Sequence, residues 1–130
     1  MSDEPRILVV DDEPTLLKIM VRVLSPLPAR VDTAADGMRA LELMRATEYD
    51  LVISDVRMPQ LDGAQLLQRA IEEKVLRGAC VFLTGHADYS PQHLMRLGAD
   101  EVLKKPISRN ILIELAQRYS EIGRVRRRGD

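Results

Sequence analysis

The sequence predicts an α/β fold, a doubly wound parallel sheet with helices on both faces, in a single domain. Two observations favour it. Five short apolar runs alternate with stretches whose apolar residues recur at helical spacing. The 130 residues, 45% of them hydrophobic, are enough for one domain with one sizeable core. Strands that alternate with helices call for right-handed crossovers, which place helices on both faces of a parallel sheet.

The predicted strands are short, contain many β-branched residues and lack strict alternation. This pattern is typical of strands that are covered on both faces. The second strand is the most polar of the five. The five ranges are 7–10, 30–34, 51–54, 80–83 and 101–103.

The predicted helices follow from apolar stripes and from their start signals. Ser90 before Pro91 indicates an N-cap with proline at the first helical position, and Pro14 marks the start of the first helix. Three further cap candidates are Asp36, Asp62 and Ser108. The stripes consist of Leu16, Leu17, Met20, Val23 and Leu24; Ala40, Leu41 and Met44; Leu66, Leu67, Ala70 and Ile71; and Ile111, Leu112, Leu115 and Tyr119.

Composition excludes several classes of protein. The net charge of −1 provides no overall attraction to nucleic acid or to membranes, and we expect direct binding to neither. Residues 1–6 do not resemble a signal peptide and no apolar run is long enough for a membrane span, which favours a cytoplasmic protein. The single cysteine, Cys80, lies in an apolar run and is expected to be a buried, inert thiol.

Polar residues capable of chemistry follow the ends of the predicted strands. Asp11 and Asp12 come after the first strand and Asp55 after the third. Thr84 follows the fourth, and Lys105 lies near the end of the fifth. Because open parallel sheets bind ligands beyond the carboxyl ends of their strands, these side chains are expected to share one site.

Three carboxylates in one place require a counter-charge. Two carboxylates about 4 Å apart repel each other by roughly 4 kcal/mol at an effective dielectric constant of 20. A magnesium ion, which prefers carboxylate, water and phosphate oxygens, would offset this repulsion, as would a lysine. With Thr84 and Lys105 as donors, the set forms a site for a phosphoryl group, and Asp55 can be its nucleophile.

Four segments resemble the motifs of response-regulator receiver domains of two-component systems, the CheY-like superfamily. They occur in the family's order and spacing, and the resemblance extends from about residue 5 to residue 120. It implies the flavodoxin-like (βα)5 fold with strand order 2-1-3-4-5. The segments are 9–13 (VVDDE), 54–63 (SDVRMPQLDG), 83–87 (LTGHA) and 105–106 (KP).

The resemblance implies roles for individual residues. Asp55 would be phosphorylated, and Mg²⁺ (or Mn²⁺) would be bound by Asp12, Asp55 and the backbone carbonyl of Arg57. Asp11 would assist the metal, partly through water.

The resemblance also assigns the phosphoryl contacts to Thr84 and Lys105. Lys105 is preferred over its neighbour Lys104, because the family's lysine directly precedes a proline. The Lys105–Pro106 peptide bond is expected to be cis.

By the same resemblance, the donor would be a sensor histidine kinase or a phosphotransfer protein. Transfer to Asp55 followed by hydrolysis is self-modification, and the protein would not be a turnover enzyme. The fourth helix, fifth strand and fifth helix would form the output surface for a partner, a homodimer or a fused output domain. We divide the chain into a receiver domain, 1–122, and a basic tail or linker, 123–130, which is either an exposed helix end or a junction to an output domain.

One position departs from the family pattern. Receivers usually carry an aromatic residue three positions before the lysine, where this chain has Val102. Valine is short and stiff, so a large ring rotation cannot report phosphorylation there. We expect the loop after Thr84 and the fourth helix to shift instead. Arg57 and His86 would flank the path of an attacking water and tune the phosphoryl lifetime, with an exposed loop imidazole as the alternative for His86. His93 is expected to be a helix surface residue.

Two other functions remain open. The same fold can serve as a phosphorylation-independent interaction module, although the intact set around Asp55 argues against this. A flavodoxin-type protein would need amide donors for the flavin phosphate where Asp11 and Asp12 place negative charge.

Overall fold

The computed structural model describes residues 4–85 and 89–129. They form a five-stranded, fully parallel sheet in the order β2-β1-β3-β4-β5, which confirms the predicted fold class and strand order. The strands are β1 (Arg6–Val10), β2 (Arg30–Ala34), β3 (Leu51–Ser54), β4 (Ala79–Thr84) and β5 (Glu101–Lys104). The last two strands extend beyond their apolar runs, because Thr84 still pairs with Lys104.

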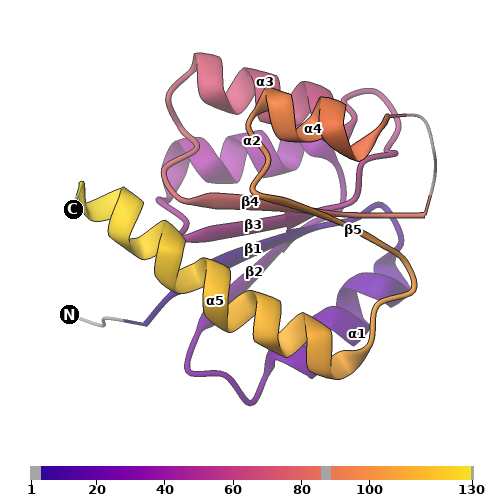
Figure 1. Cartoon of the computed structure of the whole chain (residues 1–130), viewed down its shortest axis with the longest axis vertical. Coiled ribbons are helices and arrows are strands. Elements are labelled where there is room, and N and C mark those ends of the chain that lie inside the picture. The colour runs from indigo at the N-terminus through magenta and orange to yellow at the C-terminus, as the bar shows by residue number, and fades with distance from the viewer. Residues whose placement is uncertain (1–3, 86–88, 130) are drawn as a thin grey trace.

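The described residues form five helices, which cover the sheet. Helices α2, α3 and α4 lie on one face, and α1 and α5 lie on the other (Figure 1). None of the helices in the described part of the chain is both long and apolar enough to cross a membrane. The helices are α1 (Pro14–Leu24), α2 (Gly37–Ala46), α3 (Gly63–Glu72), α4 (Pro91–Leu97) and α5 (Arg109–Arg128).

The predicted N-caps are confirmed at four helices. Asp36, Asp62, Ser90 and Ser108 each accept a hydrogen bond from the backbone amide three residues later, which satisfies a donor that the first helical turn leaves unpaired. At α3 the cap is reciprocal, since the backbone amide of Asp62 donates to the side-chain oxygen of Gln65.

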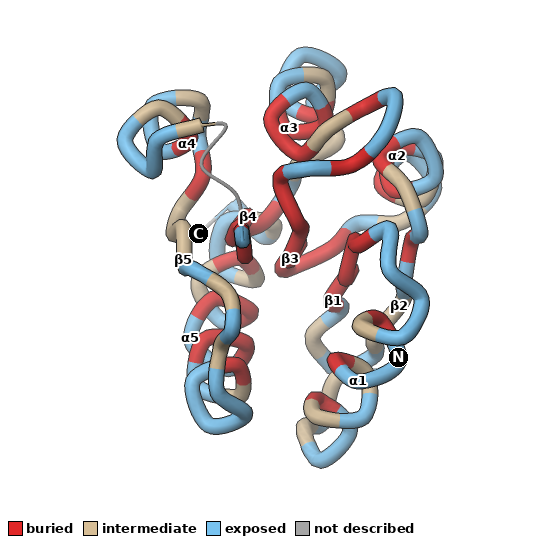
Figure 2. The backbone as a smooth tube through the Cα atoms, turned by 90° about the vertical axis from the view of Figure 1, so that its right-hand side faces the viewer, coloured by how far each residue is buried: buried red, intermediate tan, exposed pale blue. Residues whose placement is uncertain are grey.

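The sheet forms the centre of the core, and its three central strands β1, β3 and β4 are buried on both faces except for the first residue of β1 (Figure 2). Alternate residues of β1 point to opposite layers, as the two-residue period of a strand requires. Ile7 and Val9 pack with α1 and α5, whereas Leu8 and Val10 pack with α2 and α3. All residues of β3 and β4 are buried, which explains why these strands have no polar alternation.

Helix α5 continues to Arg128, through the segment that was predicted as a tail or linker. Its last turns contact the amino-terminal edge of the sheet. Arg127 Nε lies 2.6 Å from Oδ1 of the fully buried Asp50, and Arg126 lies 2.7 Å from Asp100. Two of the basic side chains of this segment therefore hold α5 against β3 and β5.

Cys80 lies within β4 with an exposed fraction of 4%, as expected for an inert thiol. Burial raises the pKa of this thiol to about 12, so almost no thiolate forms near neutral pH. We expect a disulfide-exchange reagent at pH 8 to label the native protein far more slowly than protein in denaturant. Rapid labelling of native protein, followed by absorbance, would contradict this burial.

Candidate functional site

The topology brings two acidic residues to the same edge of the sheet. Strands β1 and β3 are neighbours, with Val10 opposite Ser54, so Asp11 and Asp55 both stand one residue beyond the paired ends. The backbone amide of Asp55 donates to the carbonyl of Val10 at 2.9 Å, which fixes this alignment.

The carboxylates of Asp11, Asp12 and Asp55 form a compact group. One oxygen from each lies within 4.8 Å of the other two. The side chains of Asp11 and Asp55 are buried, with exposed residue fractions of 2% and 8%, whereas Asp12 is exposed. The group is therefore reached from solvent on the side of Asp12, where an open cavity of about 400 Å³ is also lined by Asp55 and Arg57.

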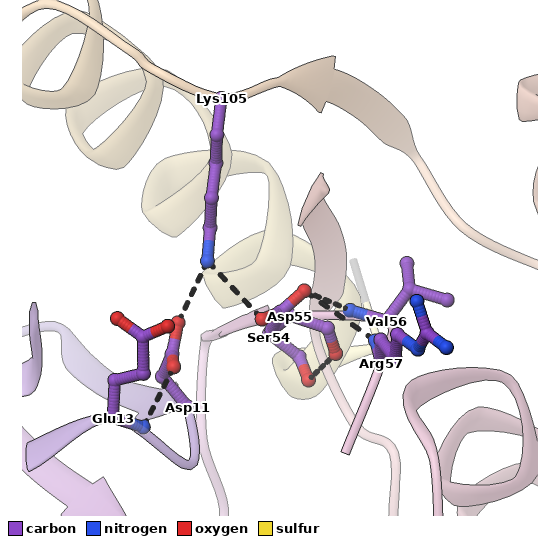
Figure 3. Close-up of polar contacts among 7 residues, drawn as sticks. All are labelled: Asp11, Glu13, Ser54, Asp55, Val56, Arg57 and Lys105. Carbon is purple, nitrogen blue, oxygen red and sulfur yellow. Dashed lines mark hydrogen bonds and ion pairs between the residues drawn. The ribbon is translucent and has the colours of Figure 1, made fainter. Parts of the chain in front are cut away.

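Lys105 supplies the counter-charge. Its amine reaches between the two buried carboxylates, with Nζ 2.9 Å from Asp11 Oδ2 and 3.1 Å from Asp55 Oδ2 (Figure 3). Partial burial by itself would lower the pKa of this amine, but the hydrogen bonds and charges of Asp11 and Asp55 outweigh burial and raise the pKa. Lys105 therefore stays cationic at neutral pH.

Backbone amides hold the other oxygen of Asp55. Asp55 Oδ1 accepts from the amide of Val56 at 2.7 Å and, more weakly, from that of Arg57 at 3.4 Å (Figure 3). Oδ1 of Asp11 likewise accepts from the amide of Glu13 at 2.9 Å. Each buried carboxylate is thus oriented by an amide on one oxygen and by Lys105 on the other.

Thr84 is the last residue of β4 and is buried. Its carbonyl accepts a hydrogen bond from the backbone amide of Lys105 at 2.9 Å, so the threonine and the lysine are adjacent at the same edge. The peptide bond between Lys105 and Pro106 is cis, as predicted. Lys104 is exposed at the end of β5, and it is Lys105 that reaches the carboxylates.

The donor set suits a hard divalent cation. Three carboxylates within 4.8 Å of one another can bind such an ion through oxygen, and the open side leaves room for water or phosphate oxygens. Magnesium commonly uses one or two carboxylates and keeps several waters. The acidic cluster could therefore hold a divalent metal ion.

Around the site, the structure adds contacts that the residue patterns did not signal. Tyr89 donates a hydrogen bond to Asp62, 27 residues earlier, and stacks on His93. The interpretation of His93 as a plain surface residue was incomplete, because its ring is half-buried against Tyr89. His86 lies outside the described residues. Val102 is half-buried and packs beside Phe82 and Leu94.

Comparison with known proteins gives a consistent result. The family model described as "response regulator receiver domain" matches residues 7–117. The chain is 34% identical, over 130 residues, to the sensor histidine kinase RcsC of Escherichia coli, covering 99% of this chain and 13% of that protein. It is 39% identical, over 107 residues, to the two-component response regulator ARR12 of Arabidopsis thaliana, covering 78% of this chain and 17% of that protein. The chain therefore spans less than a fifth of the length of either relative.

Solved structures show the same fold. The signal receiver domain of an HD domain-containing protein from Pseudomonas fluorescens superposes with a TM-score of 0.81 at 31% identity, covering 92% of this chain and 97% of that chain. The Francisella response regulator 1452 receiver domain superposes with a TM-score of 0.83 at 26% identity, covering 91% of this chain and 98% of that chain.

Proposed function

This chain belongs to the response regulator receiver family, and we propose that it is a phosphorylation-dependent switch whose phosphoacceptor is Asp55. Phosphorylation-based signalling in two-component systems is the general function of this family. For this chain, the supporting observation is the environment of Asp55. A buried carboxylate is oriented by the Lys105 ammonium and by backbone amides, beside a group of oxygens that suits a metal ion.

In the proposed reaction, a carboxylate oxygen of Asp55 attacks the phosphorus of a phosphohistidine. An oxygen–phosphorus bond forms and the phosphorus–nitrogen bond breaks, with its electron pair left on the nitrogen. A phosphohistidine protonated on its other ring nitrogen therefore leaves as neutral imidazole. Lys105 and the hydroxyl of Thr84 contact the phosphoryl oxygens and stabilise their charge. Hydrolysis then returns the carboxylate and inorganic phosphate, so the domain modifies and restores itself and is not a turnover enzyme.

The proposed metal ligands are Asp12, Asp55 and the backbone carbonyl of Arg57, with Asp11 assisting. A bound Mg²⁺ would neutralise charge on the transferring group. In its absence Lys105 already offsets part of the repulsion between the buried carboxylates, which keeps them close before any cation binds.

The relatives named as a sensor histidine kinase and a two-component response regulator support a kinase or a phosphotransfer protein as the donor. They are far longer than this chain, which supports a link to further domains in this protein as well. We propose that residues 1–122 act as the receiver and that the surface of α4, β5 and α5 carries the signal to a partner, a second copy or an output domain. A cytoplasmic location fits such a donor.

Acetyl phosphate tests the proposal, because this small donor replaces a kinase. Incubation with acetyl phosphate and Mg²⁺ is expected to add one phosphoryl group, measured by intact mass. Asp55→Asn should abolish the addition, and chelation of the metal should prevent it. Asp36→Asn is the matched control, since asparagine also caps a helix and Asp36 only caps α2.

Wild-type protein that gains no phosphoryl group would contradict the proposal and favour a phosphorylation-independent interaction module. If the Asp55→Asn variant gains the phosphoryl group as the wild type does, another residue is the phosphoacceptor.

A further inference from the structure

Tyr89 joins the two segments that leave the sheet after β3 and β4. Its hydroxyl donates to Oδ2 of Asp62 at 2.9 Å. Its ring stacks on the ring of His93 in α4, with centroids 5.6 Å apart and planes 7° from parallel. One side chain therefore connects the start of α4 to the segment that begins at Asp55.

Asp62, whose carboxylate accepts from this hydroxyl, is itself held in place by other hydrogen bonds. Its other oxygen, Oδ1, caps α3 by accepting from the amide of Gln65 at 2.8 Å. The backbone amide of Asp62 in turn donates to Oε1 of Gln65 at 2.9 Å. A carboxylate oriented in this way forms a directional, charge-assisted hydrogen bond with the tyrosine.

Asp62 lies close to the backbone of Asp55, the proposed phosphoacceptor. Gly63, the residue after Asp62, donates its amide to the carbonyl of Val56 at 2.7 Å. A Cβ atom at Gly63 would lie 2.5 Å from the carbonyl oxygen of Asp55, closer than any real contact allows. The start of α3 and the backbone of Asp55 therefore cannot move independently.

The segment that carries Tyr89 is also connected to the site, through the end of β4. Thr84 is bonded through its carbonyl to Lys105, whose amine is paired with Asp55. Tyr89 lines the same cavity of about 580 Å³ as Thr84 and Val102, between β5 and the start of α4. The short Val102 side chain leaves space in which the tyrosine ring can be repositioned.

We propose that the hydrogen bond from Tyr89 to Asp62 is a latch that holds α4 in its unphosphorylated position and breaks when Asp55 carries a phosphoryl group. A bond of 2.9 Å is lost after a displacement of less than about 1 Å, so a small shift of either segment releases it. The inference rests on the proposed function of Asp55. Because this hydrogen bond is made only in the unphosphorylated conformation, it weakens the binding of any ligand that favours the phosphorylated conformation.

The test is the affinity for beryllium fluoride in the presence of Mg²⁺, measured by calorimetry, since this anion mimics a phosphoryl group on a carboxylate. Tyr89→Phe keeps the ring and removes only the hydroxyl. It is expected to tighten binding about threefold to tenfold, the range that loss of one hydrogen bond corresponds to. Tyr49→Phe is the matched control, because Tyr49 donates to Asp32 of β2 at 2.7 Å, at the opposite edge of the sheet from β5, and its affinity should equal that of the wild type.

A second variant removes the partner. Asp62→Ser keeps an N-cap for α3 but lacks the second oxygen, so it should tighten binding like Tyr89→Phe, and the double variant should gain little more. Hydrogen exchange gives an independent readout. In the absence of beryllium fluoride, amides of α4 should exchange faster in Tyr89→Phe than in the wild type, with no such change in Tyr49→Phe.

Equal affinities of wild type and Tyr89→Phe would overturn the latch and leave the phosphoacceptor proposal standing. Additive effects of Tyr89→Phe and Asp62→Ser would also overturn it, because they would show two separate causes. A wild-type protein that binds no beryllium fluoride with Mg²⁺ would overturn both the phosphoacceptor role of Asp55 and the latch that rests on it.

Discussion

Gly123→Ala is expected to lower the free energy of unfolding by about 3 kcal/mol, although glycine to alanine in an exposed helix is usually stabilising by about 1 kcal/mol. The reason is a close approach between α5 and the start of β3. A Cβ atom at residue 123 would lie 1.6 Å from the carbonyl oxygen of Asp50 and 2.8 Å from the amide nitrogen of Ala79. Both atoms are backbone, so neither can rotate away, and the whole helix must shift.

The shift would also disturb the contacts that hold the end of α5. Asp50 is fully buried and accepts from the amide of Arg6 at 2.8 Å as well as from Arg127. Urea denaturation followed by circular dichroism would measure the loss. Glu121→Ala, at an exposed position of the same helix, is the control and should lose nothing. A Gly123→Ala protein as stable as the control would show that α5 and β3 do not pack this closely.

Lys105→Met is expected to have the largest effect on the site, because it removes the cation that two buried carboxylates share. Breaking a buried pair by removing one partner costs about 3–5 kcal/mol, and the partial exposure of Lys105 reduces this to about 2 kcal/mol. The rate of phosphorylation by acetyl phosphate should fall about 100-fold, as it does when one donor to a developing charge is removed.

Magnesium should partly restore the stability of this variant. A cation that binds the carboxylate group replaces the missing charge, so Mg²⁺ should raise the melting temperature of Lys105→Met more than that of the wild type. Thermal denaturation with and without Mg²⁺ measures this difference. If the two proteins respond equally, the amine of Lys105 and the metal ion do not compensate the same carboxylates.

The stability difference between wild type and Lys105→Met should also depend on pH. The pKa of Lys105 is raised in the folded state, so its stabilisation is fully present below the unfolded pKa of about 10.4 and is lost as pH rises through the folded value. The gap in melting temperature between the two proteins should therefore stay constant near neutral pH and narrow above about pH 10. A gap that persisted at high alkaline pH would mean that packing of the lysine stem, not its charge, stabilises the fold.

Local signals in the sequence were sufficient for most of the architecture. The caps at Asp36, Asp62, Ser90 and Ser108 follow from residue chemistry within one helical turn, and the apolar runs predict the five strands to within one residue at each end. The strand order was inferred from family resemblance, because periodicity alone does not say which strands pair. The sequence leaves residues 123–130 as either an exposed helix end or a junction, since nothing local to this basic segment indicates its partners Asp50 and Asp100.

The grouping of polar residues at the carboxyl edge could be predicted from the sequence alone, because parallel strands end on one side of the sheet and leave Asp11, Asp55 and Lys105 there. The contacts that connect this edge to the rest of the molecule became visible only in the folded chain. Tyr89 and Asp62 are 27 residues apart, and the side chains of Arg127 and Asp50 meet across 77 residues. Such contacts depend on loop paths and helix packing angles, which no local pattern of residues encodes.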